Sequence, residues 1–159
     1  MPSRSAGVLA FRTRGGQIEV LLVHPGGPYW RNKDLAAWSI PKGEFASDEA
    51  AELAARREFG EELGIKLSLP LSPLGEVRQR GGKIVEAFAV EFDVDVAAAR
   101  SNTFEIEWPP RSGTRQTFPE IDRAEWFDLT TARVKINKAQ GALLDRLEAM
   151  VEKLGKRLS

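Results

Sequence analysis

The sequence contains no cysteine. A chain without thiols cannot form a disulfide, a thiolate metal site or a covalent cysteine intermediate, and this absence suits a reducing compartment. Neither sign of charge is in excess, because 23 Lys and Arg residues balance 23 Asp and Glu residues. Since no overall field attracts nucleic acid or an acidic membrane, any binding of phosphate must come from the local placement of side chains.

Long apolar runs are also absent. The apolar stretch near the N-terminus is short and is soon interrupted by Arg12 and Arg14, so it fits neither a signal peptide nor a membrane span. We therefore expect a cytoplasmic protein with no membrane partner. A composition that is 42% hydrophobic and 29% charged is typical of a globular protein able to bury a core. We expect residues 1–159 to form a single domain.

The chain does contain a series of short segments rich in β-branched and apolar residues, which predict strands. These segments are residues 6–12, 18–24, 74–79, 83–93, 103–108 and 124–127. Gly15-Gly16 and Gly81-Gly82 separate the members of the first two pairs, which predicts two hairpins. Pro109-Pro110 and Ser112-Gly113 predict a loop before the last segment.

Two stretches have the pattern of helices. Ser47 and Asp48 offer side-chain caps for a helix that runs to about Leu63 and is stopped by Gly64. Residues 137–154 repeat apolar side chains at a helical period and place charges on the other face. A mixed sheet with these two helices predicts an α/β sandwich.

One face of the first helix carries only carboxylates. At about 100° per residue, Glu58, Glu61 and Glu62 fall within an arc of roughly 100°. The side chains expected to point away from this face, toward a core, are Leu53, Phe59 and Leu63. Like charges at this spacing repel one another, and the C-terminal half of a helix disfavours anions, so a cation should compensate.

Two explanations account for this acidic face. In the first, the glutamates are solvated and pair with Arg56 and Arg57. In the second they hold a metal ion, and a ligand set made only of oxygen favours a hard cation such as Mg²⁺ or Mn²⁺. Because Mg²⁺ usually leaves coordination positions for phosphates, the second explanation points to a phosphate-containing substrate.

The spacing of the surrounding residues favours the metal site. Gly43 is followed after five residues by Glu49, and after seven more by Arg57-Glu58-Phe59, Glu61-Glu62 and Gly64-Ile65. This stretch resembles the Nudix box at every defined position. The resemblance implies a Nudix α/β/α sandwich with a mixed sheet, a box helix and a C-terminal helix. It also implies a Mg²⁺- or Mn²⁺-dependent hydrolase of phosphoanhydride bonds in nucleoside polyphosphates.

The same resemblance implies a role for each residue of the box. Glu58 and Glu62 would be metal ligands, and Glu61 a ligand or the group that activates water. Arg57 would orient Glu58 and Glu49. The backbone carbonyl of Lys42 would complete the coordination, and glycine at 43 would let the loop turn that carbonyl toward the metal.

Outside the box, residues 20–43, residues 119–129 and the final helix resemble one Nudix branch. That branch contains asymmetrical diadenosine tetraphosphate hydrolases and bacterial RNA pyrophosphohydrolases. In those enzymes a glutamate a few residues before a late Trp reaches the metal site, and Glu120, six residues before Trp126, is in the comparable place. Glu107 and Glu125 are the rival candidates. We expect Glu120 to lie on a mobile segment that closes over a long substrate.

Four residues are candidates for binding the substrate. Lys42 and Lys83 resemble phosphate-contacting lysines of that branch, although an exposed solubilising role is an equal alternative for Lys83. Tyr29 and Trp30, in a Pro/Gly-rich loop, are placed to stack on a base. The single histidine, His24, is expected to be structural.

The expected partner is a small-molecule nucleotide, most readily a dinucleoside polyphosphate such as diadenosine tetraphosphate. Two alternatives share the chemistry: a (d)NTP pyrophosphohydrolase that cleans the nucleotide pool, and an RNA 5′-end pyrophosphohydrolase. The neutral net charge argues against a stable nucleic-acid partner. An alternative of another class is a Nudix module that binds nucleotide without hydrolysis, but such modules have lost box glutamates that this chain keeps. We expect a monomer or a homodimer.

Overall fold

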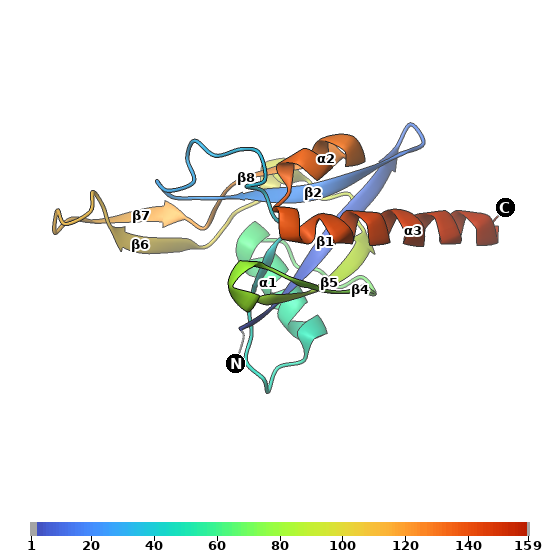
Figure 1. Cartoon of the computed structure of the whole chain (residues 1–159), viewed down its shortest axis with the longest axis horizontal. Coiled ribbons are helices and arrows are strands. Elements are labelled where there is room, and N and C mark those ends of the chain that lie inside the picture. The colour runs from blue at the N-terminus through green and yellow to red at the C-terminus, as the bar shows by residue number, and fades with distance from the viewer. Residues whose placement is uncertain (1–2, 159) are drawn as a thin grey trace.

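The computed structural model describes the backbone of residues 3–158 and the side chains of residues 3–155, and its centre is a six-stranded sheet (Figure 1). The strands of this sheet are β1 (Arg4–Arg14), β2 (Gln17–Pro25), β3 (Lys42–Glu44), β4 (Ser72–Arg78), β5 (Ile84–Glu91) and β8 (Ile121–Asp128). Their order is β4-β5-β1-β2-β8, with β3 also paired to β1. Because β1 and β5 run parallel and the other pairs antiparallel, the sheet is mixed, as expected.

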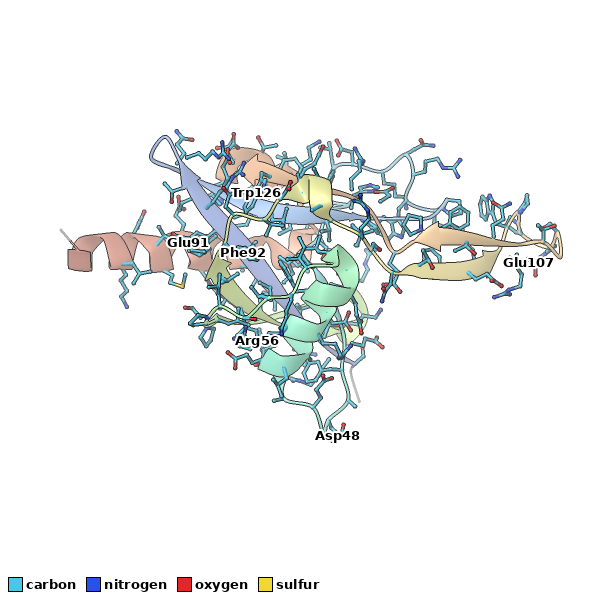
Figure 2. The ribbon with its side chains drawn as sticks, turned by 180° about the vertical axis from the view of Figure 1, so that it is seen from behind. Asp48, Arg56, Glu91, Phe92, Glu107 and Trp126 are labelled. Atoms are coloured by element: carbon cyan, nitrogen blue, oxygen red, sulfur yellow. The ribbon has the colours of Figure 1, made fainter. Side chains whose placement is uncertain are left out.

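Helices cover both faces of the sheet. They are α1 (Ala51–Leu63), α2 (Leu129–Lys135) and α3 (Gly141–Leu158), with the short 3₁₀ helices η1 (Arg80–Gly82), η2 (Val96–Ala98) and η3 (Lys138–Gln140). The views from the two sides place α1 on one face and α3 on the other (Figures 1 and 2). Phe59 and Leu63 of α1 pack in one core cluster, and Leu143 and Leu147 of α3 in the other. The expected α/β/α sandwich is therefore confirmed.

The expected box helix is present, but its start and one of its faces differ from the prediction. Ser47 and Asp48 lie in a turn, and the helix begins at Ala51 without a side-chain cap. Gly64 ends it as expected, in the left-handed conformation at φ 69°. Leu53, expected in the core, is 60% exposed, because Ala54 and Ala55 occupy the buried positions of that turn.

Several elements were not predicted, and β3 and the three 3₁₀ helices are among them. β7 (Arg115–Pro119) pairs with β6 (Thr103–Glu107) in a separate hairpin that extends away from the main sheet (Figure 1). The side chains of β7 are mostly exposed, so its sequence lacks the alternation of a half-buried strand. The short helix α2 also escaped prediction. The C-terminal helix begins at Gly141, because the Asn137 side chain caps η3 in front of it.

The box loop lies where β1 and β2 diverge. These strands pair only from Phe11 to Arg14, and beyond that point the segment Ser39–Glu44 lies between them. Gly7 of β1 permits this approach, since a Cβ atom there would lie 2.5 Å from the carbonyl oxygen of Pro41. The loop that carries Lys42 and Gly43 is therefore fixed by the sheet, beside α1. Within residues 3–158, no helix is both long and apolar enough to cross a membrane.

Candidate active site

Helix α1 directs two of its three clustered glutamates inward. Glu58 and Glu62 are each 8% exposed, whereas the Glu61 side chain is 41% exposed. The backbone N–H of Lys42 donates to Oε2 of Glu62 at 2.9 Å. Burial raises the pKa of Glu62 to about 8, and the neighbouring Glu58 and Glu120 also raise it, against the opposing effect of Lys42.

Glu58 is packed against the box glycine. A Cβ atom on Gly43 would lie 2.0 Å from Oε2 of Glu58, so the carboxylate occupies the space that any larger residue at 43 would fill. Nη1 of Arg57 donates to Oε1 of Glu58 at 2.8 Å. Burial raises the pKa of Glu58, Arg57 lowers it, and Glu61 and Glu120 raise it further.

Arg57 connects the acidic side chains of the box. It donates to both oxygens of Glu49, at 2.8 Å and 3.0 Å, and contacts both oxygens of Glu61 at 3.4 Å. The two-pronged pair with Glu49, together with the bond to Glu58, fixes the plane of the guanidinium. These hydrogen bonds lower the pKa of Glu49 and raise that of Arg57. The structure thus brings Arg57, Glu58 and Glu49 into direct contact, the arrangement that the orienting role requires.

Glu120 lies beside this cluster, although it is 58 residues beyond Glu62 in the sequence. Its carboxylate raises the pKa of both Glu58 and Glu62, so the charges face one another. The mobility expected of this segment stays a prediction, and the structure shows the backbone of Glu120 hydrogen-bonded on both sides. The N–H of Glu120 donates to Asn102 at 2.8 Å, and its carbonyl accepts from Gly26 at 2.8 Å.

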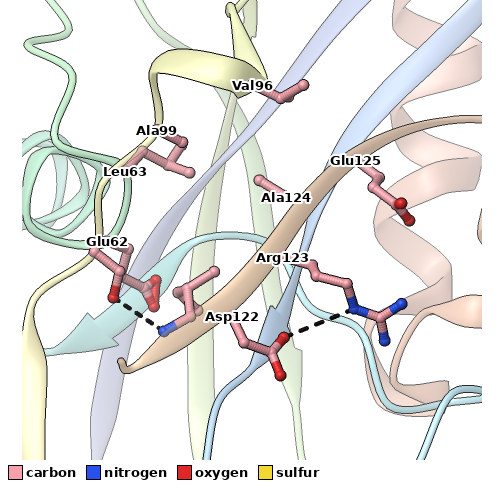
Figure 3. Close-up of a pocket in the computed structure, with 10 residues that line it drawn as sticks. Glu62, Leu63, Val96, Ala99, Asp122, Arg123, Ala124 and Glu125 are labelled. Carbon is pink, nitrogen blue, oxygen red and sulfur yellow. Dashed lines mark hydrogen bonds and ion pairs between the residues drawn. The ribbon is translucent and has the colours of Figure 1, made fainter. Parts of the chain in front are cut away.

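The two rival glutamates lie elsewhere. Glu107 is near the far end of the β6–β7 hairpin (Figure 2), where it accepts a hydrogen bond from the N–H of Gly113 at 3.3 Å. Glu125 lies on β8 and lines a hollow of about 270 Å³, which Glu62 also lines (Figure 3). That hollow lies between the end of α1, the η2 segment and β8. Of the three candidates, Glu120 is thus the one whose charge acts on both buried glutamates of the box.

A cleft of about 390 Å³ extends from the glutamates. One end carries Lys42, Glu62 and Glu120, and Trp30 also lines the cleft. The polar groups elsewhere along its wall belong to Ser39, Gln79, Asn137 and Gln140. The cleft therefore combines charged groups, an indole and several amides, as binding sites for polar small molecules do.

The substrate-binding candidates separate into two sets. Lys42 and the 39% exposed Trp30 line the cleft, and the ammonium of Lys33 lies 5.1 Å from the Trp30 ring. Tyr29 instead packs edge-on against Trp108, at 5.2 Å between ring centroids. Lys83 lines a neighbouring hollow. Burial lowers the pKa of Lys42, and the charge of nearby Lys83 lowers it further while Glu62 opposes this shift.

A model of the NUDIX domain matches residues 1–147. The chain belongs to the Nudix family. Its domain is that of a Nudix hydrolase.

Three known proteins show what this Nudix domain is similar to in sequence or in fold. The Ap4A hydrolase of C. elegans, in a binary complex, is 23% identical, with a TM-score of 0.63 over 95% of this chain and 98% of its own. The C-terminal domain of mouse MUTYH, in complex with human PCNA, is 18% identical, with a TM-score of 0.62 over 96% and 91%. An octanoyltransferase of Myxococcus xanthus is 28% identical over 131 residues, and the chain spans 32% of that protein's length. At these identities the solved structures show a shared fold.

Nudix hydrolases typically use divalent metals, and the donor set here fits one. Glu58 and Glu62 each accept a hydrogen bond on one oxygen, and no described residue donates to the other oxygen. Burial raises the pKa values of both carboxylates, and the charge of Glu58 raises that of Glu62 further, so both would gain from a nearby cation. Among the side chains of residues 3–155, no three acidic or imidazole groups lie close enough together to form a ready-made metal cage. The coordinating role of the Lys42 carbonyl stays a prediction.

The contacts of two buried polar residues, Gln140 and His24, were not predicted from the sequence. Gln140, fully buried, accepts from the N–H of Ile40 at 3.1 Å and donates to Gln79 at 2.8 Å. His24, also fully buried, contacts Oδ1 of Asp122 through Nδ1 at 2.8 Å. The structural role expected of His24 agrees with this burial. The partners lie 61 to 100 residues away in the sequence, so no local pattern links them.

Proposed function

We propose that this Nudix hydrolase is a Mg²⁺- or Mn²⁺-dependent pyrophosphohydrolase whose substrate is a dinucleoside polyphosphate such as diadenosine tetraphosphate. The observation that carries the proposal is that the buried Glu62 lines the cleft together with Lys42 and Glu120, with the buried Glu58 one helical turn before Glu62. Two buried carboxylates, with the exposed Glu120 and an ammonium near them, suit a polyphosphate held with its counter-cation.

Each charged residue near the cleft has its own role in the proposed reaction. Arg57 holds Glu58 in position, and the backbone of Lys42 holds Glu62. The ammonium of Lys42 offsets the charge of the phosphate chain. Hydrolysis forms one P–O bond from water, breaks one P–O anhydride bond and releases a proton, which Glu61 or Glu120 is placed to receive. Glu58 and Glu62, with Glu120, would hold the divalent cation, which when bound neutralises phosphate charge and lowers the pKa of water.

The preference for a dinucleoside substrate rests on the rest of the cleft. Trp30 offers an indole for stacking on a base, and Gln79 and Asn137 offer amides, all beyond the acidic end. Lys83 lies near Lys42, so positive charge continues past the glutamates. A substrate with a long phosphate chain and a base at each end could contact all of these groups together. The Ap4A hydrolase of C. elegans shares the fold over 95% of the chain, which agrees with this proposal.

The test is a substrate panel resolved by chromatography, with Mg²⁺, with Mn²⁺ or with EDTA. The panel contains diadenosine tetraphosphate, several dNTPs, a sugar nucleotide and triphosphate-ended RNA. We expect diadenosine tetraphosphate to give the highest kcat/KM, and EDTA or Glu62→Gln to abolish turnover. Glu52→Gln, an exposed change on the same helix, is the matched control and should be silent. Hydrolysis of dNTPs alone would overturn the substrate, and full activity in EDTA would overturn the metal-dependent reaction.

A further inference from the structure

A second hollow, of about 530 Å³, adjoins the cleft. Gln79 and Asn137 line both, so they form the wall between cleft and hollow. Three cationic side chains line the hollow: Arg80 of η1, Lys83 at the start of β5 and Lys138 of η3. All three are exposed, and none forms an ion pair with a carboxylate among the side chains of residues 3–155.

The orientation of both amides in the wall can be derived from backbone donors. The N–H of Ile40 can only donate, so the Gln140 atom that faces it, at 3.1 Å, must be Oε1. Nε2 of Gln140 then donates to Gln79 at 2.8 Å, so the Gln79 atom facing it must be Oε1. The amino group of Gln79 is consequently the end left free to meet a ligand.

The orientation of the Asn137 side-chain amide is derived in the same way. The N–H of Ala139 donates to its side chain at 2.9 Å, so Oδ1 is occupied in capping η3 and the amino group is left free. The side chains of the hollow that carry polar groups therefore offer three cations and two amino groups, which are donors alone. Three like charges gathered without a counter-charge repel one another, and an anion with several oxygens would relieve that repulsion and accept all five donors.

We propose that this hollow is a second anion site, which binds phosphoryl groups remote from the glutamates of the Nudix box. This proposal rests on the proposed function in one respect: the distal phosphates of a long substrate are one source of the anion. Free inorganic polyphosphate is the other source, with the same chemistry. Lys42 and Lys83 lie close enough for their charges to interact, so positive charge runs from the box to the hollow.

The first experiment measures binding without catalysis. Inorganic tripolyphosphate is titrated calorimetrically into the protein in EDTA, which removes the metal-dependent site. The double variant Arg80→Ala/Lys138→Ala should raise the Kd about tenfold or more, because two charged donors are lost. Lys66→Ala, which removes an exposed charge beside a different hollow, is the matched control and should leave the Kd unchanged. Equal Kd values for the double variant and the wild type would overturn the site.

The second experiment identifies the source of the anion. If the distal phosphates of the substrate occupy the hollow, the double variant should raise the KM for diadenosine tetraphosphate about tenfold while kcat stays within about twofold. The KM for a dNTP should hardly change, since a shorter chain would not reach. A weaker Kd for tripolyphosphate with an unchanged KM assigns the hollow to free polyphosphate. If no nucleotide is hydrolysed yet tripolyphosphate binding is lost in the double variant, the proposed function fails and the anion site stands.

Discussion

The backbone N–H of Gly26 donates a hydrogen bond to the carbonyl oxygen of Glu120 at 2.8 Å. The approach is so close that a Cβ atom on Gly26 would lie 2.0 Å from the carbonyl oxygen of Pro119. Glycine at the end of β2 therefore sets the position of Glu120 from the far side of the cleft.

We predict that Gly26→Ala lowers kcat about tenfold or more, because the β7–β8 connection must shift and move the Glu120 carboxylate. Steady-state kinetics on the preferred substrate measure the effect. Gly141→Ala is the control, since a Cβ atom there meets nothing within 4 Å. Wild-type turnover by a well-folded Gly26→Ala protein would show that the position of Glu120 does not matter.

The carboxylate of Glu120 should itself be needed for turnover. Glu120→Gln is expected to lower kcat about 100-fold with a much smaller change in KM, because the charge acts in the transition state and not in docking. Glu107→Gln and Glu125→Gln should both be nearly silent, because these side chains lie on the hairpin arm and in another hollow. If Glu107→Gln instead lowers kcat strongly, Glu120 is the wrong assignment and Glu107 is the third carboxylate of the site.

The contrast between the box and Glu120 shows how far the sequence alone can predict this site. Gly64 and the spacing of Glu58 and Glu62 are local features, so the helix, its end and its acidic face could be read directly. Glu120 was placed only through resemblance to other Nudix enzymes. Its contacts with Gly26 and Asn102 depend on how the strands assemble.

The fold shows the same division between local and long-range features. The strands rich in buried residues were predicted, because burial in a sheet selects β-branched and apolar side chains. β7 has no buried face and was missed. The wall formed by Gln79 and Asn137, and the contact of Gln140 with Gln79, join segments that lie far apart in the sequence. Polar residues that make such contacts leave no period in the sequence.

The stability of the metal-free protein should fall as pH rises. The pKa of Glu62 is about 8 in the folded state against 4.5 for a free side chain, so between these values the folded state binds more protons than the unfolded state. Stability is therefore greatest below about pH 4.5 for this group and is lost progressively up to about pH 8. In EDTA, the wild-type Tm should drop more between about pH 6 and pH 8.5 than that of Glu62→Gln.

Other groups titrate in this range, so the difference between the two proteins isolates Glu62. Millimolar Mg²⁺ should raise the wild-type Tm more at the higher pH, because the cation binds the ionised carboxylate of the folded state. It should have little effect on Glu62→Gln. If Tm in EDTA falls with pH by the same amount in the wild type and in Glu62→Gln, the raised pKa of Glu62 is contradicted.

Gly43 and Glu58 should be energetically coupled, because a Cβ atom at 43 would lie 2.0 Å from Oε2 and 2.1 Å from Cδ of Glu58. Gly43→Ala must push the carboxylate out of its place, which overpacks the loop and should cost about 1–3 kcal/mol of unfolding free energy. Glu58→Ala empties that space. In the double variant, the added cost of Gly43→Ala should therefore fall close to zero, a coupling that a double-mutant cycle in urea measures.

Glu52→Ala, on the same helix but exposed, is the matched partner for a control cycle and should show no coupling. Additive costs in the Gly43–Glu58 cycle would mean that glycine is needed at 43 for its backbone alone, whereas strong coupling means that it is needed to leave room for the buried carboxylate.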